Sequence, residues 1–242
     1  APGKMRKRAV GCGAARQAQR LEVERKKVKF QAISVMTHEL KAPLAAVENF
    51  INILKDPTTA EDQDTYLHCV NRSLARLQGM RKLISDMLDY SAIEAGIKER
   101  EITDVDLATL AKTAIETVED DASKRRITIS FEAGEDATIR ADQGEMEIIL
   151  NNLITNAVKY NRDEGTVDIS LHHNDDGMVI RVADTGIGLA PEEQEKLFKD
   201  FVRIKNKKTR RIEGSGLGLS TVARLVKRYN GEIKLKSEPD VG

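Results

Sequence analysis

The 242-residue sequence predicts an α+β protein, in which a long antiparallel helical hairpin precedes a mixed domain of helices and strands. Three observations support this prediction. Apolar residues recur at steps of three and four between Leu21 and Gly96, as in amphipathic helices. Alternation of apolar and polar residues, which is typical of strands, begins only at Ile127. The length is comfortable for two domains.

The first helix is expected from about Leu21 to Lys55, and "DPTTAED" ends it because Pro57 cannot continue a helix. A second helical pattern runs to Gly96. Such a hairpin has no closed core, so we expect it to pair with a second copy as a four-helix bundle. Its apolar stripes are Ile33, Met36, Leu40, Leu44, Val47, Ile51 and Leu54, then Leu67, Val70, Leu74, Leu77, Met80, Ile84 and Met87.

The second half predicts an α+β domain around a largely antiparallel sheet. Helices are expected at "LATLAKTAIETVEDDASKRR", "QGEMEIILNNLITNAVKYN" and "STVARLVKRYNG", the last closed by Gly231. Strands are expected at "ITISFEA", "TIRAD" and "EIKLKS", and "NDDG" predicts a hairpin with a loop longer than two residues. The expected organisation is a basic segment at 1–20, the hairpin at 21–97, a linker at 98–106 and the second domain at 107–242.

Composition excludes some classes of function. Lys plus Arg (39) equals Asp plus Glu (39), so no global field recruits nucleic acid, and the lack of Trp weakens any base-stacking role. Cys12 and Cys69 form neither a metal spacing nor a disulfide framework, as expected in a reducing cytoplasm. No apolar run approaches the length of a membrane span. The basic first residues are either a solvated tail or a juxtamembrane segment of a longer, membrane-bound receptor.

His38, in "VMTHELKAPLAAV", is the first candidate for chemistry. Each helical residue turns about 100°, so His38 points roughly 160° away from the stripe centred on Leu40 and should face solvent. An exposed imidazole is a competent nucleophile near neutral pH, and Glu39 can accept or orient a ring proton. Pro43 removes a backbone hydrogen bond at a cost of about 3 kcal/mol, which stability alone would rarely favour. A merely solvated histidine is the alternative.

Two glycine-rich turns in the second half predict a phosphate cradle. "VADTGIGLA" follows a strand and "GSGLGLSTVARL" precedes a helix, where free backbone N–H groups attract anions. On the helix that precedes both turns in the sequence, Asn152 and Asn156 share a face with Lys159 and Tyr160 close by. Asparagine oxygens suit Mg²⁺, and Lys159 can neutralise phosphate charge. Ordinary turns and a polar surface are the alternatives, while P-loop, Rossmann and protein-kinase signatures are absent.

Together these motifs resemble the cytoplasmic catalytic core of a sensor histidine kinase. "THELKAPL" resembles the phosphoacceptor box, "LNNLITNAVKY" the N box, "DTGIGL" and "GSGLGLS" the two glycine boxes, and "KLFKDFVR" the phenylalanine box. They occur in the family's order. The resemblance implies a dimerisation and histidine-phosphotransfer hairpin, followed by an ATP-binding α/β sandwich like that of DNA gyrase and heat-shock chaperones.

The resemblance also implies roles for single residues. His38 matches the phosphorylated histidine, with Glu39 as its base. Asn156 matches the Mg²⁺-binding asparagine, with Asn152 alongside. The implied reaction is transfer of the γ-phosphoryl group of ATP to His38, then to an aspartate of a response regulator receiver domain, in a homodimer.

The remaining matches surround the nucleotide. Lys159 and Tyr160 match phosphate and adenine-side contacts, and Asp184 matches the aspartate that binds the adenine amino group. Arg203 falls where the family often has a phosphate-contacting arginine, and residues 199–213 match its mobile lid. The matching glycines are Gly186, Gly188, Gly214, Gly216 and Gly218.

The sequence departs from the family at Ala42, where many relatives carry Thr or Asn that positions a water for dephosphorylating the regulator. We therefore expect weak phosphatase activity. Relatives also usually continue beyond "SEPDVG" into a final strand, so a shortened chain is one expectation. Two alternative functions stay open: a catalytically silent dimerisation scaffold, and another ATPase on the same nucleotide-binding fold.

Overall fold

The computed structural model describes residues 34–242, apart from 57–58, 60–61, 97–98, 135, 201, 205, 207–208, 210–211, 213 and 215. The expected basic segment at 1–20, Cys12 and the start of the first helix up to Ile33 lie outside the described residues. The chain divides into two compact units, residues 1–82 and 83–242. Among the described helices, none has the length and apolarity that a bilayer crossing requires.

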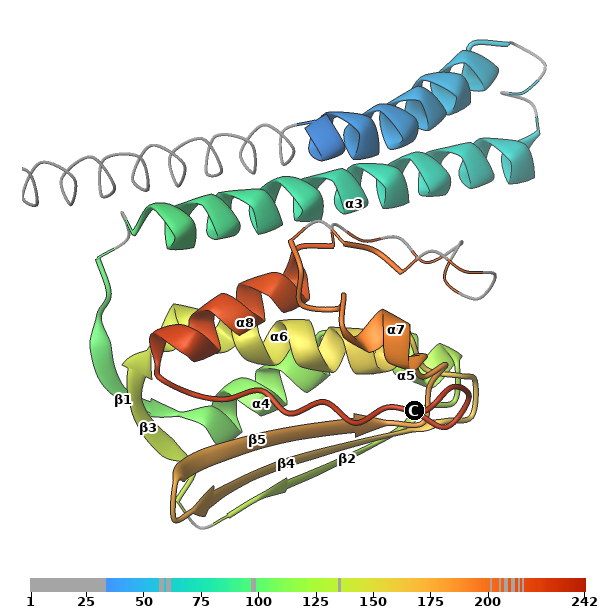
Figure 1. Ribbon diagram of the computed structural model, residues 1–242. Helices are drawn as coiled ribbons and strands as arrows, with labels where there is room; N and C mark the ends of the chain where they lie inside the picture. Colours follow the sequence, from blue (N-terminus) through green and yellow to red (C-terminus); the bar gives the residue numbers. More distant parts are fainter. Residues whose placement is uncertain are drawn as a thin grey trace, which may run out of the picture. The chain divides into compact units, whose positions relative to one another are not determined.

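The expected helical hairpin is present. Residues 34–54 are helical and continue through Pro43, and α3 spans Gln63–Ala95 (Figure 1). Asp62 caps α3, since its carboxylate accepts hydrogen bonds from the Asp64 and Thr65 backbone at 3.2 and 3.4 Å. The Thr65 hydroxyl also donates to this carboxylate, and that bond is the main reason why the pKa of Asp62 is lowered.

Much of the predicted apolar stripe of the hairpin stays accessible in a single chain. Met36, Val47 and Cys69 are buried, and the rings of Phe50 and His68 meet edge to face at 6.5 Å. Six other stripe residues are 43–52% exposed: Leu44, Ile51, Leu67, Leu74, Leu77 and Ile84. Large aliphatic side chains left this open along two helices mark a surface that is incompletely covered.

The second unit contains two small sheets. Strands β1 (Ile102–Asp106) and β3 (Thr138–Asp142) pair antiparallel. The other sheet has the order β2-β4-β5, formed by Thr128–Ala133, Thr166–Asn174 and Gly177–Asp184. Strands β4 and β5 are antiparallel, as expected for a hairpin, whereas β2 runs parallel to β4.

Helices cover one face of the three-stranded sheet and form the second layer of a sandwich (Figure 1). They are α4 (Leu107–Glu116), α5 (Glu119–Lys124), α6 (Gln143–Lys159), α7 (Pro191–Gln194) and α8 (Gly218–Arg228). The core fills the space between the layers, because alternate residues of β4 and one face of α6 point into it. Its most buried side chains include Leu107, Leu150, Ile154, Val167, Ile169, Leu171 and Leu225.

Some expected boundaries were wrong. Residues 102–106, expected in the linker, form β1 because every one of them has a partner in β3. The single helix expected at 107–126 is broken at Val118, whose N–H donates to Ile115 O instead of continuing the α-helical pattern. This tighter turn lets Val118 and Ala122 both reach the core.

Three turn and strand expectations were also wrong. Strand pairing reaches Asn174 and Gly177, so the hairpin loop has two residues, Asp175 and Asp176. Helix α8 closes through Asn230, which takes the left-handed conformation with φ 55°, while the Gly231 N–H donates to Val226 O. Residues 232–237 form no strand. Their alternation of apolar and polar residues shows which side could be buried, but a strand also needs a neighbouring strand to hydrogen-bond with.

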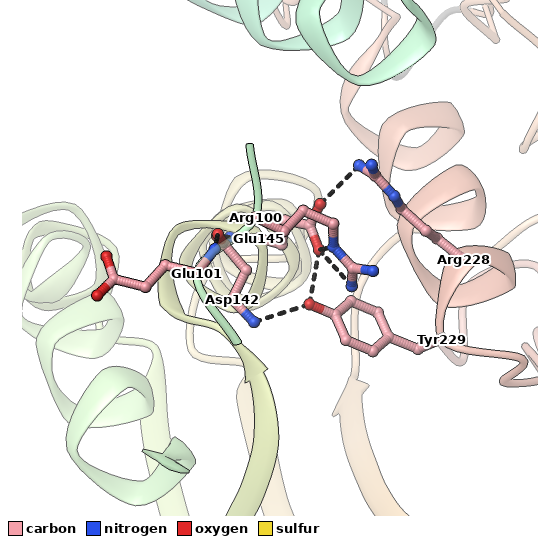
Figure 2. A network of polar contacts seen from close by, with 6 residues as sticks. All are labelled: Arg100, Glu101, Asp142, Glu145, Arg228 and Tyr229. Carbon is pink, nitrogen blue, oxygen red and sulfur yellow. Dashed lines mark hydrogen bonds and ion pairs between the residues drawn. The ribbon is translucent and has the colours of Figure 1, made fainter. Parts of the chain in front are cut away.

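A buried carboxylate joins the start of α6 to the end of α8 and to the residues before β1. Figure 2 shows Arg100, Arg228 and Tyr229 meeting at Glu145, which is only 3% exposed. Arg100 Nε, Arg228 Nη1 and Tyr229 Oη donate to this carboxylate at 3.0, 2.8 and 2.6 Å. Arg100 Nη2 lies 3.0 Å from the same carboxylate, and its guanidinium stacks over the Tyr229 ring at 4.5 Å.

The neighbouring Asp142 extends this network. Its carboxylate accepts hydrogen bonds from the backbone N–H groups of Glu145 and Glu101, both at 3.0 Å. It therefore caps α6 and also holds the segment that leads into β1. The Asp142 N–H in turn donates to Tyr229 Oη at 2.9 Å, so the two buried carboxylates belong to one network.

We predict that Glu145→Ala destabilises the second unit. The change removes the carboxylate that pairs with two arginines, but both arginines keep partial access to water. We therefore expect the free energy of unfolding to fall by about 3 kcal/mol, the low end for breaking a buried ion pair. Urea unfolding of the whole chain measures this, with exposed Glu147→Ala as the matched control on the same helix. Equal unfolding midpoints for the two variants would contradict the prediction.

Candidate functional site

His38 lies where helical geometry predicted. Its side chain is exposed on the helix of residues 34–54, whereas Met36, two residues earlier, is 4% exposed. Glu39 is half-buried beside it, and Ala42, one turn later, is exposed like His38. The imidazole is therefore open to an external reactant, and Ala42, four residues after it, has no hydrogen-bonding side chain.

Helix α6 presents the polar residues expected at a nucleotide site. Asn152 and Asn156 are half-buried on one face, and Asn152 Nδ2 donates to Ile148 O at 2.7 Å. Within the described part of the chain, the Asn156 amide has no hydrogen-bond partner, so it can bind a ligand. Lys159 Nζ lies 5.5 Å from the centre of the Tyr160 ring, a cation–π distance.

The turn after β5 packs tightly against the end of α6. The Ile187 N–H donates to Tyr160 O at 3.1 Å, and a Cβ placed on Gly186 would lie 2.4 Å from that oxygen. Gly188 has φ +58°, which glycine adopts without strain. The Asp184 carboxylate accepts a hydrogen bond from the Gly186 N–H at 2.8 Å, which fixes one of its two oxygens.

The turn before α8 meets the same helix from another side. A Cβ on Gly218 would lie 2.1 Å from Asn152 Oδ1, and a Cβ on Gly214 would lie 3.0 Å from Lys159 Nζ. Gly216 has φ +70°, in the left-handed region. Both glycine turns therefore converge on the second half of α6 at positions where a side chain would collide with it.

Burial shifts two titratable groups at this convergence. Desolvation raises the pKa of Asp184 above its ordinary value, and the hydrogen bond from Gly186 partly opposes this effect. Desolvation also raises the pKa of Tyr160, whereas the nearby charge of Arg203 lowers it. Arg203 Nη2 donates to Ile212 O at 2.7 Å, which ties two parts of the expected lid together.

The donor groups indicate which cofactor could fit. No group of three or more His, Cys, Asp or Glu side chains that could hold a metal exists among the described residues. A hard divalent cation could instead use the unpartnered Asn156 amide oxygen together with the phosphate oxygens of a bound nucleotide. The residues present therefore fit Mg²⁺ carried in with a phosphate ligand.

The structure brings together the predicted residues of the second unit and leaves two in the first. Asn152, Asn156, Lys159, Tyr160, Asp184, Arg203 and the five glycines lie in residues 83–242. His38 and Glu39 belong to residues 1–82.

Sequence reasoning missed residues that hold this arrangement. Arg125 contacts the end of α6, and Asn161 and Thr185 join that end to the turn after β5. No local pattern indicates Arg125, because its partners lie 33–38 residues away. "YN" and "DT" are signals that could have been used, since Asn and Thr often hydrogen-bond nearby backbone in turns.

Tyr90 and Arg224 were also missed. Arg224 Nη2 donates to Tyr90 Oη at 2.9 Å and pairs with Asp200, at the start of the expected lid segment. Tyr90 Oη donates to the same Asp200 carboxylate at 3.1 Å. Burial raises the pKa of Tyr90 above its ordinary value.

Comparison with known proteins agrees with this geometry. Residues 28–96 match the His Kinase A (phospho-acceptor) domain, and residues 141–242 match the histidine kinase-, DNA gyrase B- and HSP90-like ATPase. The sensor-like histidine kinase SenX3 of Mycolicibacterium smegmatis is 27% identical over 210 residues, covering 87% of this chain and 54% of SenX3. The chain thus spans about half the length of the curated relatives it matches.

Two solved structures show the same fold. Full-length ShkA in complex with AMPPNP has a TM-score of 0.56 and 26% identity, covering 81% of this chain and 40% of ShkA. Histidine kinase ThkA in complex with response regulator protein TrrA has a TM-score of 0.62 and 24% identity, covering 88% of this chain and 60% of that one. With both domain matches in the order that the motifs predicted, the chain belongs to the sensor histidine kinases.

Proposed function

We propose that this chain binds ATP with Mg²⁺, transfers the γ-phosphoryl group to His38 and passes it to an aspartate of a response regulator. The observation that carries the proposal is the convergence of two glycine turns on α6 in a chain that also displays an exposed imidazole. The Asn156 amide, which has no hydrogen-bond partner among the described residues, adds to this support because it can bind a ligand.

The proposed ATP site divides the nucleotide among three elements. Asp184 would bind the adenine amino group, with Tyr160 beside the base, while Lys159 and Arg203 would neutralise phosphate charge. Backbone N–H groups at the start of α8 suit phosphate oxygens, and Gly214, Gly216 and Gly218 would let the phosphates approach them. The solved ShkA structure contains AMPPNP, an ATP analogue, which supports ATP as the ligand.

Asn156 would hold Mg²⁺, with Asn152 alongside. The ion would supply charge neutralisation at the phosphate oxygens during transfer. The Asn152 amide is already oriented, since its nitrogen donates to Ile148 O and its oxygen lies against Gly218. The Asn156 amide has no such hydrogen bond among the described residues, so its oxygen can turn toward the ion.

The transfer itself needs few groups. The Nε2 lone pair of His38 attacks the γ-phosphorus, an N–P bond forms, and the bond to the bridging oxygen breaks as ADP leaves with its electrons. Glu39 accepts the Nδ1 proton of the resulting imidazolium. Positioning and charge neutralisation supply most of the catalysis in such reactions.

We infer that the hairpin at 21–97 is the dimerisation and phosphotransfer domain. The nucleotide-binding domain, expected at 107–242, begins earlier in this proposal, because it includes β1. The incompletely covered leucines and isoleucines of the hairpin support pairing with a second copy as a four-helix bundle. A receiver domain would contact the hairpin near His38, because its aspartate must reach the phosphorylated imidazole. ThkA, a histidine kinase of the same fold, has been solved in complex with a response regulator protein, TrrA.

We predict that incubation with γ-labelled ATP and Mg²⁺ labels His38. The label should be acid-labile and base-stable, as expected for a phosphoramidate, and peptide mapping should place it in residues 34–54. His38→Ala should abolish labelling, whereas His172→Ala, which changes another exposed histidine, should leave it unchanged.

Other outcomes would support the competing functions. Release of phosphate without labelling would indicate an ATPase, and failure to bind ATP with Mg²⁺ would indicate a silent scaffold. Acid-stable label on a hydroxyl residue would also contradict the proposal.

We predict that Asn156→Ala weakens Mg²⁺-dependent ATP binding. Loss of the metal-binding amide should lower the affinity by at least about tenfold, roughly 1.4 kcal/mol. Isothermal titration with ATP, with and without Mg²⁺, measures the effect. The control is Asn151→Ala, an exposed asparagine on the same helix, and an equal response of both variants would argue against the assignment.

We predict that Ala42 limits dephosphorylation of the regulator. Ala42 is exposed one helical turn after His38 and has no group to orient a water. Decay of a phosphorylated regulator should be slow with the natural chain and faster with Ala42→Thr, measured by the loss of label. Equal rates would refute this role of position 42, and Ala46→Thr serves as a control one turn further on.

A further inference from the structure

The last turn of α6 is closed by a side chain from a distant part of the chain. Arg125 Nη1 donates to Val158 O at 2.8 Å, Nη2 donates to Asn161 O, and Nε donates to Asp163 Oδ1 at 2.9 Å. The last carbonyls of a helix have no partners within it and carry partial negative charge. Arg125 Nη1 bonds one of them, Val158 O, and lies 3.5 Å from the next, Lys159 O, so Arg125 holds the helix end that presents Lys159 and Tyr160.

Asn161 connects this end to two other elements. Its side chain belongs to a residue only 4% exposed, and Nδ2 donates to Thr166 O at 2.9 Å. Its Oδ1 accepts from the Arg162 N–H at 2.9 Å and from the Thr185 hydroxyl at 3.3 Å. A buried amide with its hydrogen bonds made in three directions allows little movement of the groups around it.

Thr185 continues the connection to the residue that would bind adenine. Its hydroxyl accepts from the Thr166 N–H at 2.8 Å, and its own N–H donates to Thr166 O at 3.1 Å. Thr185 directly follows Asp184, whose Oδ1 is fixed by the Gly186 N–H. The backbone next to Asp184 is therefore anchored at Thr166, and one carboxylate oxygen is left for a ligand.

Gly165 shows how closely this junction is packed. A Cβ at this position would lie 2.2 Å from Asn161 Oδ1 and 2.8 Å from Thr185 Oγ1. Gly165 does not have positive φ, so the backbone alone does not require glycine there. The space is limited by the Asn161–Thr185 hydrogen bond itself.

We propose that Asn161 and Thr185 are positioning residues that set the Asp184 carboxylate for recognition of the adenine amino group. This inference rests on the proposed ATP site and adds the source of its base specificity. Asn161 and Thr185 do not contact the base; they act through the anchored turn. Without their hydrogen bonds, the Asp184 carboxylate would still be present, but its second oxygen would no longer be held in one orientation.

The test compares ATP with inosine triphosphate, which carries a carbonyl where ATP carries the amino group. Affinities of both, with Mg²⁺, are measured by titration calorimetry on the full chain, together with unfolding midpoints. Asp184→Asn is the reference for lost recognition, Thr185→Val removes the hydroxyl, Thr185→Ser retains it, and Asn151→Ala is the surface control.

The natural chain should prefer ATP, and Thr185→Val should reduce the preference by about tenfold, as expected for weakening one hydrogen bond to a charged group. Thr185→Ser and Asn151→Ala should keep the preference, and Asn161→Ala should lose it like Thr185→Val. If Asn161→Ala does not fold, the Val and Ser variants still decide the question.

An equal loss of affinity for both nucleotides in Thr185→Val would show a merely structural role and overturn this inference alone. Preservation of the preference in Thr185→Val while Asp184→Asn loses it would do the same. Failure of the natural chain to bind either nucleotide would overturn the proposed function and this inference together.

Discussion

The burial of one face of α6 is the constraint on which the candidate site depends. Leu150 and Ile154 are completely buried, and each is followed two residues later by a half-buried asparagine, Asn152 or Asn156. Two helical steps turn a side chain to nearly the opposite direction. Burying each large aliphatic side chain contributes roughly 1.5–3 kcal/mol, so a rotation that hid the amides would expose the core face at a greater cost. Packing therefore sets the direction of the amides.

Buried and half-buried polar groups fix the two ends of this helix. Glu145 and Asp142 hold the start, and Arg125 with Asn161 holds the end. A buried ion pair often contributes little more stability than apolar residues of the same volume. Here the polar contacts fix the position of α6 along its axis. Apolar contacts would tolerate sliding of the helix, whereas hydrogen bonds of defined geometry do not. The glycine turns, which have no spare room against α6, require that accuracy.

Local periodicity predicted the helices, the strands β2 to β5 and the exposure of His38, because each depends on residues close in sequence. The same reasoning failed where distant partners decide the outcome. Residues 102–106 form a strand because β3 pairs with them, and residues 232–237 form none although their pattern alternates. The glycines and asparagines of the candidate site could be predicted from the sequence, because their residue types and spacing are typical of a nucleotide site. The contact of Arg125 could not be predicted in this way, since it forms only when the end of α5 meets the end of α6.

The helical repeat also separates two functions of the hairpin. Leu44 and Ile51 are incompletely covered in one chain, and the proposed pairing with a second copy would bury them. His38 lies two residues from Leu40 and from Met36, so the imidazole points away from the stripe that would pair. Formation of the bundle therefore need not cover the proposed nucleophile. A histidine one residue earlier or later would point nearer the edge of the stripe, where pairing would restrict access to it.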